Sequence, residues 1–475
     1  MIVPDWLARA AAARPDHPAL VAPEETLTFR ALETRVAAAA AAIRAWGLPP
    51  GARVGALLPN GTALVTLVHA VPRAGAVLVL LDPRAPAEEV ARCGRAAALA
   101  ALVADGDPRA DAAGVPVVRV PLDGVAGAAP APPLLDLDAP HTVVFTSGTS
   151  GPARPVVLTA GNHAWSAFGS AARLGAPPDE RWLACLPLWH VGGLAGVVRS
   201  AIHATTVVLH PRFDAEAVAR ALDEDGVTMV SLVPTALARL ARVRPPRRLR
   251  CALVGGAAAG ADLLRAAAAH GWPVAPTYGC TEAASQVATA APGDPRALDG
   301  TVGPPLLATR VRIARPDGSD AAPGEPGEIR VHGPTVARGV LEPDGAIRPL
   351  AADGWLATSD LGTLDADGVL RVLGRRDDVI VTGGENVSPA EVEHVLAALP
   401  GVGEVAVAGV RDAEWGEVVA AWVVPARDAA PPTLEELRAG ARSRLAAHKL
   451  PRRLHLVERL PRTASGKVRR RALAT

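Results

Sequence analysis

The stretch Phe145-Thr-Ser-Gly-Thr-Ser-Gly151 decides how this chain is read, because an apolar run passes there directly into hydroxyl and glycine residues. The preceding Val143-Val144 predicts the end of a buried strand. A loop of this composition can surround phosphate oxygens with backbone N–H groups and hydroxyls. No Gly-Lys-Ser/Thr follows, so the stretch is not a Walker loop. Taken alone, it fits a surface turn as well as it fits a phosphate site.

Two further clusters carry groups that suit a nucleotide. Tyr278, the only tyrosine of the chain, has a planar ring that can stack on a purine, and Glu282 offers a hard oxygen to Mg²⁺. Asp360 can accept hydrogen bonds from the two hydroxyls of a ribose, and Arg375 can add charge-assisted hydrogen bonds. Each of these side chains, considered alone, is more simply a solvated group at a turn or on the surface.

The fourth cluster, Pro461-Arg-Thr-Ala-Ser-Gly-Lys467, places an ammonium on a glycine-flanked loop. The chain has 49 lysine and arginine residues together, but only Lys449 and Lys467 are lysines. A lysine that remains in so arginine-rich a chain is therefore a candidate for a specific role. A compact ammonium can bridge an attacking carboxylate and an α-phosphate that repel each other. The alternative is a plain basic tail, because Arg469, Arg470 and Arg471 follow closely.

The order of the predicted elements indicates an α/β protein. Alanine-rich helical segments (31–46, 214–223 and 261–269) alternate with short Val/Leu-rich strands, a pattern typical of largely parallel sheets. From about residue 300, short strands and turn residues predict β-hairpins. We therefore expect a large N-terminal domain of α/β subdomains plus a β-rich subdomain (1–374), a hinge (375–378) and a small mobile α+β C-terminal lid domain (379–475).

Composition excludes several classes of function. The chain has 475 residues and a net charge of +1, which gives no global attraction to nucleic acid or an anionic membrane. The most apolar region, residues 63–81, is interrupted by charged and proline residues and predicts no membrane span. Four scattered cysteines and an N-terminus without a leader pattern predict a cytoplasmic location. The oligomeric state stays open, a homodimer included.

Together, in this order and separation, the four clusters resemble the adenylate-forming superfamily of acyl-CoA synthetases, luciferases and peptide-synthetase adenylation domains. The likeness spans nearly the whole chain, from Leu27-Thr-Phe-Arg-Ala-Leu32 to Lys467. It implies ATP, Mg²⁺ and CoA as co-substrates and cofactor, and a small carboxylic acid as the substrate. Arg154 departs from the usual phosphate loop, where lysine is common, and Ser359 stands where glycine is usual.

The resemblance also implies a role for each residue of the four clusters. It implies that the nucleotide phosphates are bound by Thr146, Ser147, Gly148, Thr149, Ser150, Gly151 and Arg154. Adenine would contact Gly256, Ala257, Tyr278 and Gly279, and the ribose would contact Asp360 and Arg375. Thr281 and Glu282 would contact the α-phosphate and Mg²⁺. Lys467 corresponds to the catalytic lysine and Asp377 to the hinge. Gly383 and Gly384, within Thr382-Gly-Gly-Glu-Asn386, would border the CoA tunnel in the second half-reaction.

Within the superfamily the chain most resembles the o-succinylbenzoate–CoA ligases of menaquinone biosynthesis. The supporting stretches are Gly161-Asn-His163, Trp182-Leu-Ala-Cys-Leu-Pro-Leu-Trp-His190 and His210-Pro-Arg-Phe-Asp214. This likeness implies that His190 gates the acyl pocket, that Arg199 pairs with the second carboxylate of the acid, and that Ser285 and Gln286 line the pocket wall.

Three alternatives remain at this stage. A CoA ligase for another aromatic or medium-chain acid would give the charge of Arg199 nothing to pair with. A peptide-synthetase module is disfavoured because no carrier domain follows and because Gly383-Gly384-Glu385-Asn386 resembles CoA ligases. An inactive nucleotide-binding regulator is favoured only by the altered phosphate loop.

Overall fold

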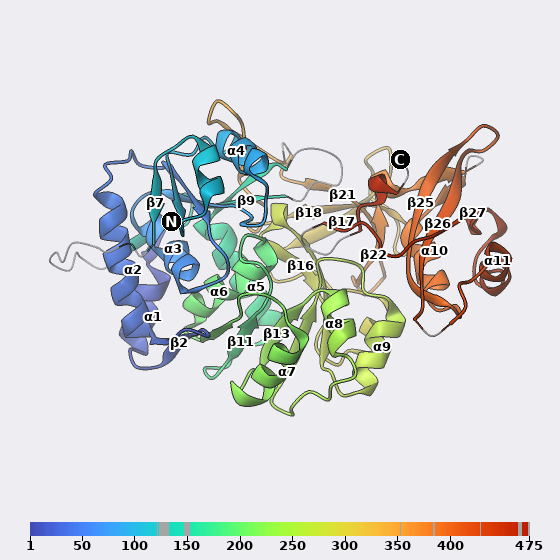
Figure 1. Ribbon diagram of the computed structural model, residues 1–475, viewed down its shortest axis with the longest axis horizontal. Coiled ribbons are helices and arrows are strands. Elements are labelled where there is room, and N and C mark those ends of the chain that lie inside the picture. Colours follow the sequence, from blue (N-terminus) through green and yellow to red (C-terminus); the bar gives the residue numbers. More distant parts are fainter. Residues whose placement is uncertain are drawn as a thin grey trace.

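The computed structural model describes residues 1–120, 122, 133–146, 153–351, 353–382, 385–427, 429–463 and 468–473. Within these ranges, strands form two eight-stranded sheets, a four-stranded antiparallel sheet, a five-stranded sheet and a short two-stranded pair. Figure 1 shows the first three packed into one large body, with the C-terminal residues as a smaller body beside it. The expected large α/β domain with a β-rich part and a small C-terminal domain is confirmed.

The first large sheet carries the predicted strand before Thr146. Its central strands pair in parallel, and its hairpin strands pair antiparallel at one side. Its order is β20 (Ile347–Arg348), β19 (Gly339–Leu341), β10 (Pro155–Thr159), β9 (Pro140–Phe145), β5 (Val77–Leu80), β4 (Arg53–Leu57), β6 (Ala101–Ala104) and β7 (Val117–Arg119). The strands β5 and β6 are buried at every position, as expected when helices cover both faces of a parallel sheet.

The second large sheet carries the predicted nucleotide residues. Its order is β16 (Ser285–Thr289), β15 (Val274–Cys280), β14 (Cys251–Val254), β13 (Met229–Leu232), β11 (Arg181–Ala184), β12 (Thr206–Leu209), β2 (Pro18–Val21) and β3 (Thr26–Thr28). The strands from β15 to β2 are parallel, and β16 and β3 close the two edges antiparallel. The short pair is β1 (Ile2–Pro4) with β8 (Leu134–Asp136).

Helices fill the space between the two large sheets and cover their outer faces (Figure 1). The largest apolar cluster joins residues of both sheets to the helices α1 (Trp6–Ala13), α2 (Phe29–Arg44), α3 (Thr62–Arg73), α5 (Ala160–Leu174) and α6 (Val191–His203). The outer faces are covered by α4 (Ala87–Ala96) on the first sheet and by α7 (Ala215–Glu224), α8 (Pro234–Leu240) and α9 (Ala261–Ala269) on the second. The predicted helices at 31–46, 214–223 and 261–269 are α2, α7 and α9.

The antiparallel part follows, as the turn residues predicted. Its sheet comprises β17 (Arg310–Ala314), β18 (Gly327–His332), β21 (Leu356–Leu364) and β22 (Leu370–Arg375). The C-terminal body contains β23 (Ile380–Thr382), β24 (Glu385–Val387), α10 (Pro389–Leu396), β25 (Val402–Asp412), β26 (Gly416–Pro425), α11 (Leu434–Ala441) and β27 (Arg453–Leu456). It has its own apolar core, so it meets the physical requirement for a separate small domain.

Short 3₁₀ helices occupy several connections. They are η1 (Pro108–Ala113), η2 (Thr281–Ala283), η3 (Pro295–Asp299), η4 (Arg376–Asp378), η5 (Ala447–Lys449) and η6 (Arg470–Ala472). Two of them fall on predicted site segments, η2 on Thr281 and Glu282 and η4 on the predicted hinge, and η6 begins three residues beyond Lys467. No described helix is both long and apolar enough to cross a membrane.

Candidate active site

The phosphate loop leaves β9 and returns through β10, two antiparallel neighbours. At its mouth the Thr146 N–H donates to the Arg154 carbonyl (3.0 Å), and the Arg154 N–H donates to the Thr146 hydroxyl (3.3 Å). The predicted residues Ser147, Gly148, Thr149, Ser150 and Gly151 lie outside the described residues. The strand therefore ends where the sequence predicted, and Thr146 and Arg154 form the two sides of the mouth of the loop.

Arg154 also contacts the predicted metal ligand. Its guanidinium donates to Glu282 Oε1 at 3.0 Å, and the Glu282 side chain is 16% exposed. Thr281 and Glu282 form η2, directly after β15. A lone carboxylate suits Mg²⁺, which binds one or two protein carboxylates and otherwise water and phosphate oxygens. Glu282 therefore fits the metal, and Arg154, which shares it, brings its positive charge to the same place.

Tyr278, Asp360 and Arg375 converge although 97 residues of sequence separate the first from the last. Asp360 on β21 and Arg375 on β22 are direct cross-strand partners, with Arg375 Nε 3.4 Å from Asp360 Oδ1. The Tyr278 hydroxyl donates to Asp360 Oδ2 at 2.6 Å. Burial and the Asp360 charge hold the pKa of Tyr278 well above its usual value, so the phenol keeps its proton. The predicted nucleotide residues thus form one hydrogen-bonded set.

Gly256 and Ala257 are exposed just beyond β14, whose parallel neighbour β15 leads into Tyr278. At Gly255 an added Cβ would lie 2.6 Å from Thr277 Cγ2, so the two strand ends approach closely. Ligands of open α/β sheets bind outside the carboxyl ends of parallel strands. The exposed pair and Tyr278 therefore share the edge at which a nucleotide base is expected.

The β15–β16 hairpin brings Gly279 against Ser285. A Cβ on Gly279 would lie only 1.6 Å from the Ser285 carbonyl oxygen, so no larger residue fits there. Ala284 and Ser285 adopt positive φ angles of 52° and 101°, a strained conformation for residues with side chains. Gln286 is buried and donates to the Thr289 hydroxyl at 2.8 Å, while its amide oxygen has no hydrogen-bond partner among the described residues.

Arg199 on α6 carries a positive charge into the interior, with its residue only 3% exposed. Its Nη2 donates to Ser166 Oγ (2.9 Å), and Ser166 Oγ donates to the Ala284 carbonyl (2.7 Å). Its guanidinium lies over the Trp182 ring, 5.5 Å from the centroid. Burial lowers the pKa of Arg199 to about 9. No carboxylate in the described part of the chain pairs with this guanidinium.

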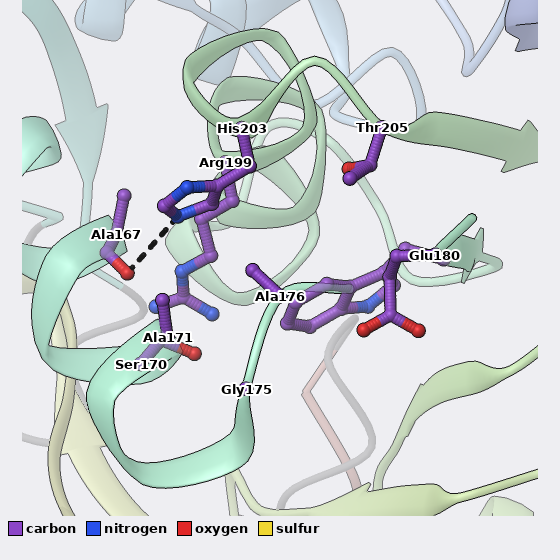
Figure 2. Close-up of a pocket in the computed structure, with 10 residues that line it drawn as sticks. Ala167, Ser170, Ala171, Gly175, Ala176, Glu180, Arg199, His203 and Thr205 are labelled. Atoms are coloured by element: carbon purple, nitrogen blue, oxygen red, sulfur yellow. Dashed lines mark hydrogen bonds between the residues drawn. The ribbon is translucent and has the colours of Figure 1, made fainter. Parts of the chain in front are cut away.

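Figure 2 shows the surroundings of Arg199 between α5 and α6. The guanidinium borders a cavity of about 10 Å³, space for roughly one water molecule, which Ser170, His203 and Glu180 also line. Glu180 pairs with Arg250 instead of with Arg199. The Nε atom of Arg199 has no hydrogen-bond partner among the described residues. A buried cation in this situation is stabilised by an anionic ligand.

His190 lies at the other end of the same helix, as the N-cap residue of α6. Nine residues at 1.5 Å each separate it from Arg199 by about 13 Å along the axis. Its ring centroid is 6.3 Å from that of Trp189, over which Arg84 stacks at 4.9 Å. The helix thus connects the predicted gate to the predicted carboxylate site.

Four predicted residues fall at or near gaps in the description. Gly383, Gly384 and Lys467 lie outside the described residues, and of Asp377 only the backbone is described, within η4. Around Lys467 the flanking arms are described: Arg462 and Val468 form an antiparallel bridge. The proposed roles of these residues stay predictions.

Sequence reasoning missed three features of the site. No sequence motif singles out Ser166, which joins Arg199 to the Ala284 carbonyl. The hydrogen bond between Tyr278 and Asp360 and the ion pair between Arg154 and Glu282 each connect residues from different elements. No local pattern could reveal these contacts, because they depend on how distant strands are placed.

Comparison with known proteins identifies the family. The model of the AMP-binding enzyme family matches residues 7–341, and the model of the AMP-binding enzyme C-terminal domain matches residues 391–467. A 2-succinylbenzoate–CoA ligase of Bacillus licheniformis is 40% identical over 99% of both chains.

Two solved structures of the o-succinylbenzoate CoA synthetase of Bacillus subtilis are also similar. Its complex with ATP and magnesium is 36% identical, covers 100% of both chains and gives a TM-score of 0.92. A double mutant bound with the product analogue OSB-NCoA is 35% identical. The match covers 100% of this chain and 98% of that one, and its TM-score is 0.75. The chain therefore belongs to the AMP-binding enzyme family, and within it to the acid–CoA ligases.

Proposed function

We propose that the chain activates 2-succinylbenzoate with ATP and transfers the acyl group to CoA, as a step of menaquinone biosynthesis. The observation that carries the choice of acid is the buried guanidinium of Arg199, which has no acidic partner in the described residues. An acid with two carboxylates can leave one on this cation while the other reacts. The relatives of high coverage bear the same activity in their names.

The first half-reaction joins the free carboxylate to the α-phosphorus of ATP. A carboxylate oxygen forms the new bond to phosphorus, and pyrophosphate leaves. Asp360 and Arg375 hold the ribose in this proposal, with Tyr278 bracing Asp360 through its hydroxyl. Thr281 and Glu282 face the α-phosphate, and Glu282 would hold Mg²⁺, which offsets negative charge on the phosphates.

Positive charge is needed because both reacting groups are anions. Arg154 stands at the phosphate loop, and Lys467 is assigned by resemblance to the carboxylate and the α-phosphate. Fixed cations in a site without bulk water lower the barrier to joining two anions more than mobile ions do. Arg154 supplies a planar fork in place of the usual compact ammonium.

The second half-reaction moves the acyl group to sulfur. The CoA thiolate attacks the acyl carbonyl carbon, the carbon–oxygen bond to AMP breaks, and AMP leaves with that oxygen. We propose that a turn at Asp377 replaces Lys467 by the segment with Gly383 and Gly384, and that His190 gates the acyl pocket. A cytoplasmic location and a homodimer belong to the same proposal.

A pyrophosphate-release screen tests the acid. The purified chain is offered ATP, Mg²⁺ and, separately, 2-succinylbenzoate, benzoate, succinate or hexanoate. We expect release with 2-succinylbenzoate to exceed release with each of the other acids by at least about 100-fold, since an unmatched buried charge discriminates strongly. Preference for benzoate or hexanoate would favour the alternative of another acid. No release with any acid would leave only the inactive nucleotide-binding regulator.

A further inference from the structure

The chain directly after Lys467 is firmly tied down. The Arg469 N–H donates to the Pro461 carbonyl (2.8 Å), and Val468 bridges to Arg462. Val468 and Leu473 pack against an apolar cluster on β25 and β26 that includes Ala406, Ala408 and Trp422. The incoming arm is held as well, because Arg462 donates to Glu404 Oε2 at 2.6 Å. Both arms of the loop that carries Lys467 are therefore fixed on the C-terminal body.

Arg470 adds an ionic anchor that reaches beyond β25 and β26. Its Nε and Nη2 donate to both oxygens of Glu393 on α10, at 3.1 and 2.6 Å, and its Nη1 donates to Asp378 Oδ2 at 3.0 Å. Glu393 also accepts from the Val407 N–H on β25 at 2.8 Å. One guanidinium thus joins the end of the chain, α10, β25 and η4. Burial opposes the charge, but the two carboxylates outweigh burial and raise the pKa of Arg470.

The turn that Arg470 reaches is the predicted hinge. Asp378 is the last residue of η4, and the first, Arg376, donates to Glu328 Oε1 on β18 at 3.2 Å. One end of η4 is therefore bonded to the large domain, and the other end to the segment that follows Lys467. Figure 1 shows the C-terminal end where the small body meets the antiparallel sheet.

We propose that Arg470 is a positioning residue that locks the arm beyond Lys467 to α10 and to the hinge turn through Glu393 and Asp378. Any rotation about η4 then carries the loop of Lys467 as part of a rigid body. This inference rests on the proposed function for its catalytic consequence, but the anchoring itself can be measured without catalysis. Separating charge-paired side chains of this kind costs free energy, because each charge would be left partly buried and unpaired.

The scarcity of lysine provides a direct measurement of anchoring. A lysine-specific endoprotease can cut only after Lys449 and Lys467, and the second cut releases residues 468–475. In the Arg470→Gln protein we expect the rate of cutting after Lys467 to rise at least about tenfold, because the arm opens more often. The rate after Lys449, which pairs with Glu391 at 2.7 Å, serves as an internal reference and should stay unchanged.

The matched control is Arg469→Gln, since Arg469 is the exposed neighbour of Arg470. It should leave both cleavage rates at their wild-type values. An unchanged rate after Lys467 in the Arg470→Gln protein would overturn the anchoring. A parallel rise after both lysines would also overturn it, because Arg470 would then support the whole small domain and not this arm.

Catalysis gives the second readout. With Arg470→Gln we expect acid-dependent pyrophosphate release to lose at least about tenfold in kcat, while thioester formation from preformed acyl-AMP stays within about twofold. Arg470→Lys, which can reach one carboxylate, should recover part of the loss. Equal loss in both half-reactions contradicts the positioning role. If the wild-type protein releases no pyrophosphate, the proposed function fails, and the cleavage rates still decide the anchoring.

Discussion

At Arg199 a guanidinium lies beside a serine hydroxyl and an indole ring, and it borders a cavity that His203 and Glu180 also line. Burying a charge without an opposite charge destabilises the fold, and burial accordingly lowers the pKa of this group to about 9. Proteins retain such groups where a ligand supplies the missing charge. The residue therefore has opposite effects on stability and on substrate binding, and a single substitution can separate them.

Arg199→Met should make the protein more stable and a poorer enzyme. Methionine preserves most of the volume and removes the buried charge, so we expect thermal unfolding to move up by about 2–4 °C. Loss of the charge-assisted hydrogen bonds should raise the KM for 2-succinylbenzoate by about 10- to 100-fold. Arg220→Met, at an exposed position of α7, should change neither quantity. A lower unfolding temperature with an unchanged KM would make Arg199 a structural residue.

At the scale of elements, the start of α6 is set by a close contact of backbones. A Cβ on Gly193 would lie 2.3 Å from the Pro187 carbonyl oxygen, whereas one on Gly192 would meet nothing nearer than a Leu186 methyl group at 3.9 Å. The helix must therefore approach the turn before it at Gly193 and not at Gly192. Because His190 caps α6 and Arg199 is on it, this approach positions the proposed gate and the buried charge together.

Alanine at the two neighbouring glycines should have opposite effects. Gly193→Ala should move α6 away from the 186–187 turn, cost about 2 kcal/mol or more in stability, and reduce kcat/KM for the acid. Gly192→Ala should be neutral or stabilising by up to about 1 kcal/mol, because alanine favours a helix over glycine. Denaturant unfolding and steady-state kinetics of both variants provide the measurement. Equal stability and equal kinetics of the two variants would contradict a close backbone contact at Gly193.

Three buried histidines line the packing between α3, β9 and α5. His141 and His163 have ring centroids 5.3 Å apart, His163 shares a hydrogen bond of 2.8 Å with Thr142, and His69 is equally buried. Burial lowers the pKa of His69 and of His163 to about 4, and that of His141 well below its usual value. All three are therefore neutral in the folded protein near pH 7.

Acid should destabilise the large domain through these histidines. Between pH 6.5 and 4 the unfolded chain binds protons that the folded chain rejects, so stability falls as the pH falls through this window. For a pKa that changes from 6.5 to about 4, the loss at pH 5 is about 2 kcal/mol per histidine. Denaturant unfolding at pH 7 and pH 5 measures it. His163→Gln, which can keep the bond to Thr142, should lose less on acidification; the same loss as wild type would exclude His163.

At the scale of the whole molecule, the structure matches two solved complexes of one relative to different degrees. The TM-score is 0.92 with the ATP–magnesium complex of the Bacillus subtilis synthetase and 0.75 with the product-analogue complex of its double mutant, at nearly equal identity.

Lys467→Ala should separate the two half-reactions. Adenylation needs the ammonium between two anions, so we expect acid-dependent pyrophosphate release to fall by about 100-fold or more. Thioester formation from preformed acyl-AMP should persist, because the proposed second arrangement removes Lys467 from the site. Rapid-quench measurement of each half-reaction checks this. Lys449→Ala, the other lysine, should spare both, and equal loss of both in the Lys467 variant would refute domain alternation.

Local patterns were enough to predict the fold class and to single out Tyr278, Glu282, Asp360 and Arg375 as candidate site residues. The hydrophobic periods of 31–46 and 261–269 predicted α2 and α9, since apolar spacing reports which face of an element is buried. The strand before Thr146 and the hairpins after residue 300 were predicted for the same reason. Roles such as the ribose contact of Asp360 came from the resemblance to a family and not from periodicity.

By itself, the amino-acid order determined which segments become strands and helices and which polar residues stand at their ends, because these properties depend on neighbours along the chain. Only the tertiary structure decided that Asp360 pairs with Arg375 and accepts a hydrogen bond from the Tyr278 hydroxyl, and that Arg199 is buried without a carboxylate partner in the described residues. It also decided that Arg470 pairs with Glu393 and Asp378. Such contacts arise from strand register and from packing between distant segments. The sequence alone does not show whether a charged residue will be solvated or buried.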